Sequence, residues 1–315
     1  MPYHHYVSAF HLAEFTASRT RTSNIWVVDL EQRKRWKRLV TRAGGQNTYN
    51  GPPVVYGESV EALIGRRYEA PAAPVLRRVN DDLSVPEGED MDALLNYVAL
   101  VSFNGPSRRG AMNDAQEQAL CFMAQMMVAH PETFEAAQAK CRRDGVPLLG
   151  AMSYEELKTA LESGHFSYMM APSAHTQAIA EGVAELSRML NTRIWSLLVA
   201  GPAVPDFVCS DAPVALVWTV DNAHRSPGLS PKDRWVPPPG FLSEDSEVTV
   251  PLGRRTCLVG TYGGASRVQT VGVSHVAEAN RRATAQAARF VFSSEETFVL
   301  LDAAGTVCGS ERLIA

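Results

Sequence analysis

The sequence has few cysteines and no long apolar run. No stretch reaches the roughly 18 apolar residues that a membrane-spanning helix needs, so we expect no membrane anchor. The start, Met1–His5, lacks a basic region followed by an apolar segment, and we expect no signal peptide. The five cysteines are far apart and form no Cys-x-x-Cys pair, which disfavours a metal site and is typical of a cytoplasmic protein with free thiols.

A strong charge of either sign is also missing. The 315 residues carry a formal net charge of −4, which argues against a protein that coats nucleic acid by bulk charge. The basic run Arg33–Arg38 is the local exception, and it is either the solvated face of a hairpin strand or a nucleic-acid contact. No phosphate-binding loop, nucleophile elbow or redox-cofactor motif is present, so the sequence indicates no particular cofactor.

What is present predicts a single α+β domain over residues 1–315. A β-hairpin is expected from a strand at Asn24–Leu30, a turn at Glu31–Arg33 and a second strand at Trp36–Val40. Helical periodicity dominates residues 57–192, and a mostly antiparallel sheet with one closing helix follows at about 193–303. A hairpin is not stable alone, so its partners should be strands of this late sheet.

The individual elements are predicted from periodicity and from Gly and Pro positions. Ser153 and Glu156 form the pattern of a capping box, and the stripe from Leu120 to Met127 is typical of core packing. Residues 222–240 are rich in proline and lack periodicity, which is typical of a lid, a binding loop or a disordered segment. The expected helices are 115–130, 133–143, 153–162, 173–191 and 273–290; the expected late strands are 194–200, 207–209, 214–220, 248–252, 256–261 and 298–301.

Asp211 is the first candidate for chemistry, because it follows a short apolar run where the chain turns. A carboxylate at a strand end can act as a general base, a metal ligand or a substrate anchor. Alternatively, Ser210 and Asp211 hydrogen-bond the turn itself. The neighbouring Cys209 is either a nucleophile or a small buried apolar residue.

Two further segments carry polar candidates. His4 and His5 are adjacent, which suits no helical metal site, but one of them can supply an acid or base from an N-terminal arm. The segment Asn104–Gly110 interrupts the helical pattern with Gly and Pro and then presents Arg108 and Arg109. It is either an anion clamp at a helix start or a solvated linker.

These pieces, in this order, resemble a bacterial family called domain of unknown function 4238. The resemblance begins at His5–Phe15, where the family has a His-Tyr-Val-Pro start, and it continues through Ile25–Asp29. Ser210–Val214 matches the family's Ser-Asp-Asn-Pro-Val. Further matches are Thr48-Tyr49, the acidic helix Glu61–Glu69, Pro251-Leu252 and the closing helix from Asn280 to Ser293.

The chain departs from the family pattern at four positions. Ser8 replaces a proline, Val101 a glutamine, Asn104 an arginine and Ala212 an asparagine, whereas Arg109 is retained. If the glutamine and arginine do chemistry in relatives, this chain has altered or lost it. Since His5 and Asp211 fall on motif positions, the resemblance implies that they are functional, although it names no reaction.

We therefore expect a cytoplasmic hydrolase or group-transfer enzyme that acts on a small polar or anionic substrate. The alternatives are a non-catalytic binding or host-defence protein, which the departures favour, and a nucleic-acid-binding protein. The expected catalytic residues are Asp211, His5 and Ser210, and the expected substrate contacts are Arg109, Asn104, Tyr6 and Asn280.

Overall fold

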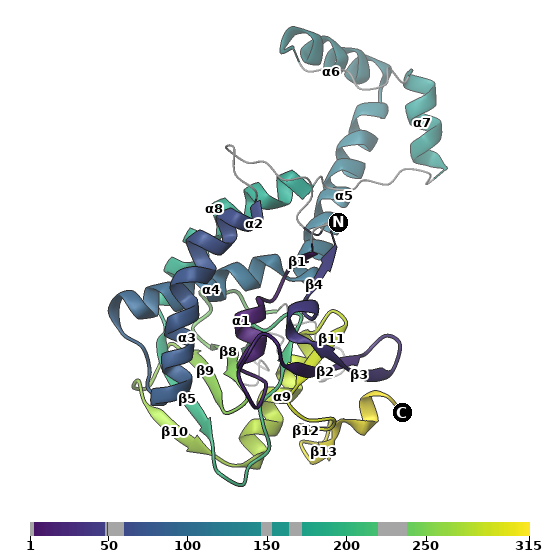
Figure 1. Ribbon diagram of the computed structural model, residues 1–315. Coiled ribbons are helices and arrows are strands. Elements are labelled where there is room, and N and C mark those ends of the chain that lie inside the picture. Colours follow the sequence, from purple (N-terminus) through teal and green to yellow (C-terminus); the bar gives the residue numbers. More distant parts are fainter. Residues whose placement is uncertain (1–2, 48, 50–59, 146–152, 164–171, 220–237) are drawn as a thin grey trace, which may run out of the picture. The chain divides into compact units, whose positions relative to one another are not determined.

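The computed structural model describes residues 3–47, 49, 60–145, 153–163, 172–219 and 238–315 (Figure 1). The chain divides into two compact units. The first combines Met1–Arg108 with Pro172–Ala315, and the second is Arg109–Ala171. The fold is α+β, as predicted, and a single-domain organisation stays a prediction. Of the proline-rich segment, residues 220–237 lie outside the described part.

The centre of the first unit is a five-stranded sheet in the order β10-β5-β9-β8-β7. Only β10 and β5 are parallel, so the expected mostly antiparallel sheet is confirmed. The strands are rich in β-branched residues, which suit a pleated and half-buried surface. Their bounds are β5 (Ile194–Ala200), β7 (Ala215–Trp218), β8 (Ser246–Gly253), β9 (Thr256–Thr261) and β10 (Val268–Val271).

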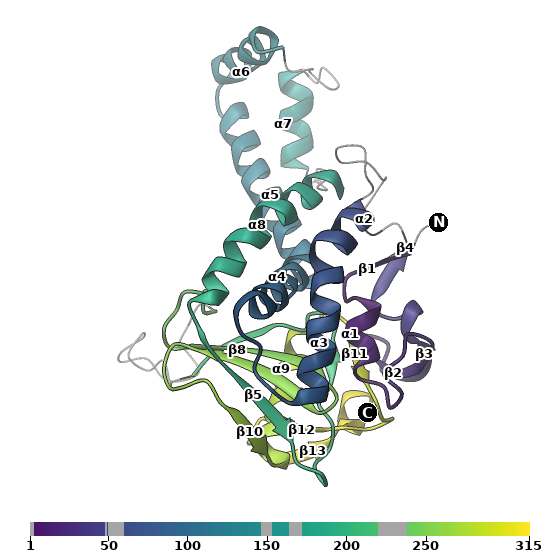
Figure 2. The ribbon, with the colours of Figure 1, turned by 60° about the vertical axis from the view of Figure 1, so that its left-hand side comes forward.

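Three helices cover one face of this sheet, and a fourth packs on the other (Figure 2). The first three are α3 (Ala70–Asp82), α4 (Gly88–Asn104) and α8 (Pro172–Asn191). Apolar side chains of α4, such as Leu94 and Val98, pack with Trp195 and Leu197 of β5 in one core cluster. On the opposite face, α9 (Val273–Gln286) contributes only Val276 and small alanines, so it covers little of the sheet.

A second sheet joins the two ends of the chain in the order β3-β2-β11-β6. The hairpin of β2 and β3 is confirmed, and Arg33 in its turn has a φ of 52°. Strand β11 pairs with β2 and places Phe290 opposite Asp29, which confirms that the hairpin takes a late strand as partner. The bounds are β2 (Asn24–Asp29), β3 (Lys34–Leu39), β6 (Cys209–Ser210) and β11 (Phe290–Ser293).

Short elements complete the first unit. β1 (Tyr3–His5) pairs with β4 (Gly45–Asn47), and β12 (Val299–Leu301) pairs with β13 (Val307–Gly309). Helix α2 runs into α3 through a π-helical turn, η2. The remaining bounds are α1 (Ala9–Ala13), η1 (Val40–Arg42), α2 (Val60–Ile64), η2 (Gly65–Glu69) and η4 (Ser310–Leu313).

Two boundary predictions were wrong. The break predicted at Asn104–Gly110 is confined to Gly105, because Pro106 starts helix α5 (Pro106–Val128), a position where its missing N–H costs nothing. The closing helix ends at Gln286 rather than at residue 290. Phe290–Ser293, whose aromatic and β-branched residues favour a strand, forms β11 instead.

The second unit holds most of α5 together with α6 (Pro131–Arg143) and α7 (Tyr154–Glu162). The capping box of Ser153 and Glu156 is confirmed. The prediction that the methionine-rich stripe packs in a core was wrong. Phe122 is 62% exposed, Met123 51% and Met126 58%.

Candidate site at the N-terminal strand

His5 lies at the end of β1, opposite Gly45 of β4. Its ring is half-buried, and Nε2 is a buried atom without a hydrogen-bond partner. Burial lowers the pKa of His5, and the nearby Glu61 carboxylate opposes that shift. The imidazole is therefore held neutral near physiological pH, with a ring nitrogen still available for a proton or a ligand.

A second titratable group, Glu69, lies close enough to Glu61 for the two carboxylates to interact, as His5 does. Glu69 closes the π-helical turn, accepts a hydrogen bond from the Ser8 hydroxyl, and has its pKa raised by burial. Glu61 raises the pKa of Glu69 further, since two carboxylates in one cluster repel each other. Glu61 thus acts on both His5 and Glu69, and Figure 2 shows the helix that carries both glutamates beside β1 and β4. Single-turn π-helices often occur at functional sites.

The end of α4 fixes the backbone of His5. Asn104 is buried, and its side-chain amide donates to the His5 carbonyl at 3.0 Å. The Asn104 carbonyl accepts from the Tyr49 hydroxyl at 2.7 Å, and the Tyr49 ring packs edge-on against Tyr6, with 5.4 Å between centroids. The structure thus brings together three sequence-predicted residues: His5, Tyr6 and Asn104.

The Asp211 carboxylate faces the backbone rather than a hollow. Its Oδ1 accepts from the Ala288 N–H at 2.7 Å, and its Oδ2 accepts from the N–H groups of Arg289 and Phe290, each at 2.9 Å. Burial raises the pKa of Asp211, and these donors oppose the rise. Among the two readings that the sequence left open, this geometry favours a structural role.

Ser210 and Asn280 also bond to the backbone. The Ser210 hydroxyl donates to the Ala212 carbonyl at 2.9 Å, which closes the turn around Asp211. The Asn280 side chain accepts from Val208 N–H at 2.9 Å and donates to the carbonyls of Asp206 and Val299. Asn280 therefore links α9 to strand β12 and to the segment before β6.

Arg109 lies in the first turns of α5 and belongs to the second unit. The two units are described separately, so its expected contact with a substrate stays a prediction. Cys209 is fully buried, and burial raises the pKa of its thiol, which disfavours the reactive thiolate. All five cysteines are free thiols.

The sequence predictions missed Glu69, which binds the Ser8 hydroxyl, and missed His11 altogether. The ring of His11 is fully buried, with Nε2 2.8 Å from the Pro251 carbonyl and Nδ1 3.2 Å from the Tyr97 hydroxyl. Burial lowers the pKa of His11 to about 4. The available signal was the spacing of three between Ser8, the N-cap of α1, and His11 within that helix.

Within the residues that the structure describes, no three His, Cys, Asp or Glu side chains come together in a way that could bind a metal ion. Nor does any helix there combine the length and apolarity required to cross a bilayer.

The fold and the candidate site define an α+β protein with a half-buried histidine at the end of β1 and a half-buried glutamate in η2. The chain belongs to the family described as a protein of unknown function, DUF4238, whose model matches residues 3–297. Neither a curated protein nor a solved structure matches it.

Proposed function

We propose that the chain is an acid/base enzyme, a hydrolase or group-transfer enzyme that acts on a small polar or anionic substrate. His5 serves as the base and Glu69 as the acid. The proposal is supported by two groups with opposite pKa shifts, lowered for His5 and raised for Glu69, on both of which the Glu61 carboxylate acts. Such pairs supply a neutral base and a protonated acid near the same pH.

The other predicted residues take supporting parts in this proposal. Asn104 holds the backbone of His5, and the Tyr49 hydroxyl, whose ring packs against Tyr6, donates to the Asn104 carbonyl. Asp211 is a positioning residue: its carbonyl oxygen lies 3.3 Å from where a Cβ on Gly105 would stand, next to Asn104.

A hydrolysis screen tests the proposal on the full chain. p-Nitrophenyl acetate, p-nitrophenyl phosphate and bis(p-nitrophenyl) phosphate cover ester, monoester and diester chemistry. We expect turnover of one of them, and a loss of about 10²-fold or more in kcat for His5→Gln and for Glu69→Gln, because general acid–base groups contribute that much. His130→Gln, at an exposed histidine, is the matched control.

Activity that survives both substitutions would remove the pair from the mechanism. An NMR titration of His5 gives a second readout that needs no substrate. The proposal requires an imidazole pKa below the ordinary value of 6.5, and Glu61→Gln should lower it further, because the Glu61 carboxylate raises the pKa of His5.

A non-catalytic binding role is the second candidate, favoured by the exposed stripe of Phe122, Met123 and Met126 on α5. Contiguous exposed apolar side chains often mark protein contacts. Met123→Glu with Met126→Glu should then abolish cross-linking to a partner in cell extract, whereas Glu132→Gln should not. Unchanged cross-linking would exclude the stripe as the contact.

A further inference from the structure

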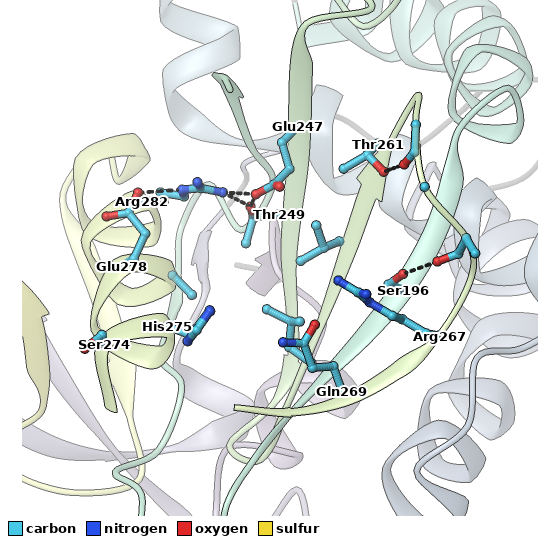
Figure 3. Close-up of a pocket in the computed structure, with 16 residues that line it drawn as sticks. Ser196, Glu247, Thr249, Thr261, Arg267, Gln269, Ser274, His275, Glu278 and Arg282 are labelled. Atoms are coloured by element: carbon cyan, nitrogen blue, oxygen red, sulfur yellow. Dashed lines mark hydrogen bonds and ion pairs between the residues drawn. The ribbon is translucent and has the colours of Figure 1, made fainter. Parts of the chain in front are cut away.

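A hollow of about 550 Å³ lies between α9 and the face of the five-stranded sheet that α3, α4 and α8 do not cover (Figure 3). This volume falls within the range of small-molecule sites. The hollow exists because α9 packs on the sheet with small residues such as Ala279, and because β10 extends the sheet beyond it. None of the residues of the His5 cluster lines it.

The floor of the hollow is partly apolar. Leu198 of β5, Val259 of β9 and Ala279 of α9 line it, and the hydroxyls of Ser196, Thr249 and Thr261 lie among them. The loop after β9 forms one wall, where the Thr261 hydroxyl donates to the Gly263 carbonyl at 2.8 Å and Ser196 donates to the Ala265 carbonyl at 3.4 Å. Such a floor accommodates the apolar body of a ligand.

Ion pairs between Arg282 and two glutamates, whose opposite charges compensate each other, close one end of the hollow. Arg282 is 17% exposed and pairs with both Glu247 and Glu278, with 2.8 Å between its Nε and Glu278 Oε1. It also donates to the Thr249 hydroxyl at 2.8 Å. Because two carboxylates already flank Arg282, this end offers a ligand no uncompensated positive charge.

The opposite end carries cationic and amide groups. Figure 3 shows Arg267 and Gln269 reaching into the hollow from the β10 side and His275 facing them from the first turn of α9. Arg267 and Gln269 are two residues apart on extended chain, so alternation places both on the same face. Within the described residues, the side chains of Arg267 and His275 form no ion pair and no hydrogen bond. Their donors are therefore directed at the hollow or at solvent.

We propose that this hollow binds a small organic anion, one with a carboxylate or phosphate group and an apolar body about the size of one ring. Arg267 and Gln269 bind the anionic group, with His275 adding a donor from α9, and the apolar body packs on Leu198, Val259 and Ala279. A guanidinium suits this task because its fork of N–H groups matches two oxygens of a carboxylate or phosphate. This site is independent of the proposed acid/base function.

Isothermal titration calorimetry on the full chain tests the proposal with three probes: benzoate, phenyl phosphate and uncharged benzyl alcohol. We expect at least one of the two anions to bind and benzyl alcohol not to bind. Arg267→Gln should weaken anion binding about tenfold or more, since hydrogen bonds between charged groups are stronger than those between neutral groups. Comparing benzoate with phenyl phosphate distinguishes a carboxylate site from a phosphate site.

Arg188→Gln is the matched control, because Arg188 is an exposed arginine on α8 that pairs with Glu185. It should leave the affinity unchanged. The proposal is overturned if neither anion binds at millimolar concentration, if benzyl alcohol binds as tightly as benzoate, or if Arg267→Gln and His275→Ala both bind the anions like the unmodified protein.

Discussion

The Asp211 carboxylate connects two segments that are far apart in the sequence. It accepts hydrogen bonds from three consecutive N–H groups, those of residues 288–290, just where the chain leaves α9 and enters β11. A carboxylate has lone pairs for all three donors, and no neutral side chain of the same shape does.

Asp211→Asn should therefore destabilise the protein. The asparagine amide presents an N–H₂ group to backbone N–H donors and leaves at least one of them buried without an acceptor, which costs about 1–3 kcal/mol. Urea unfolding at neutral pH measures the loss. Asp90→Asn is the control, because Asp90 forms an exposed pair with Arg78 and should change stability by less than about 1 kcal/mol. Equal effects of the two variants would contradict this structural role.

His11 makes stability depend on pH. Its pKa of about 4 in the folded protein lies below the 6.5 of an exposed histidine, so the unfolded chain binds the proton more readily. The contribution of neutral His11 is fully present above pH 6.5 and is lost as the pH falls from 6.5 towards 4. The difference amounts to about 3 kcal/mol.

The test compares unfolding free energies at pH 7 and at pH 4.5 for the unmodified protein and for His11→Gln. Glu69 and Asp211, whose pKa values are raised, act in the opposite direction, so the difference between the two proteins isolates His11. His11→Gln should lose less stability on acidification. An identical pH dependence in both proteins would show that His11 is not the group responsible.

The structure gives the positions of the predicted site residues, and their functional roles stay predictions. His5, Tyr6, Asn104 and Asp211 were all singled out, and all are at least half-buried around the end of α4. The role of Asp211 could not be read from its neighbours, because its partners lie 77 to 79 residues further along the chain. Burial and distant backbone donors leave no local pattern.

Among the secondary-structure elements, the pairing of β1 with β4 requires the glycine at position 45. A Cβ on Gly45 would lie 2.4 Å from the His4 carbonyl oxygen and 2.7 Å from the Tyr3 ring. Both atoms belong to β1, so any side chain at Gly45 pushes that strand, and His5 with it, away from β4.

Gly45→Ala should accordingly separate β1 from β4. We expect a loss of about 1–3 kcal/mol from overpacking, together with faster amide exchange in β1 and a His5 pKa that moves back towards 6.5. Hydrogen exchange and the NMR titration measure these effects. Gly240→Ala is the control, since its Cβ would meet only Ser243 at 3.7 Å. Slow exchange in β1 of the Gly45 variant would refute the argument.

Strand β3 lies at an edge of its sheet and carries the basic run that suggested nucleic-acid binding. Arg35 pairs with Glu296, and the Lys37 ammonium lies 5.1 Å from the centre of the Trp26 ring. Charged side chains on an edge strand prevent pairing with other chains. The basic run Arg33–Arg38 is thus explained by its place on an edge strand, which agrees with its interpretation as the solvated face of a hairpin.

The predicted bounds of the elements agree with the structure where the local sequence pattern was strong. Strands β5 and β9 begin and end at the predicted residues, and the capping box starts α7 as expected. The prediction failed at β11 because no Gly or Pro separates it from α9, so helical periodicity seemed to continue. It failed for the methionine-rich stripe because periodicity indicates an apolar face but not whether anything covers it.

At the level of the whole molecule, the three core clusters draw all their residues from the first unit. Those residues of 109–171 that the structure describes contribute none of them. The stability of the first unit should therefore not depend on the second.

Replacing residues 109–171 by a flexible Gly-Ser linker tests this independence. We expect the shortened chain to unfold cooperatively with a Tm within a few degrees of the full chain, and to keep the lowered pKa of His5. Calorimetry and the NMR titration measure both. A shortened chain without a cooperative transition would show that the first unit needs the second.

The pairing of β2 with β11 has a consequence for synthesis on the ribosome. The hairpin emerges early, but its partner strand is more than 250 residues away, since Asp29 lies opposite Phe290. Because synthesis proceeds at about 5–20 residues per second, one hydrogen-bonding edge of β2 remains unpaired for some tens of seconds. During that interval the nascent chain offers a strand edge to chaperones and to neighbouring chains, so translation speed and chaperone supply should govern the yield of folded protein.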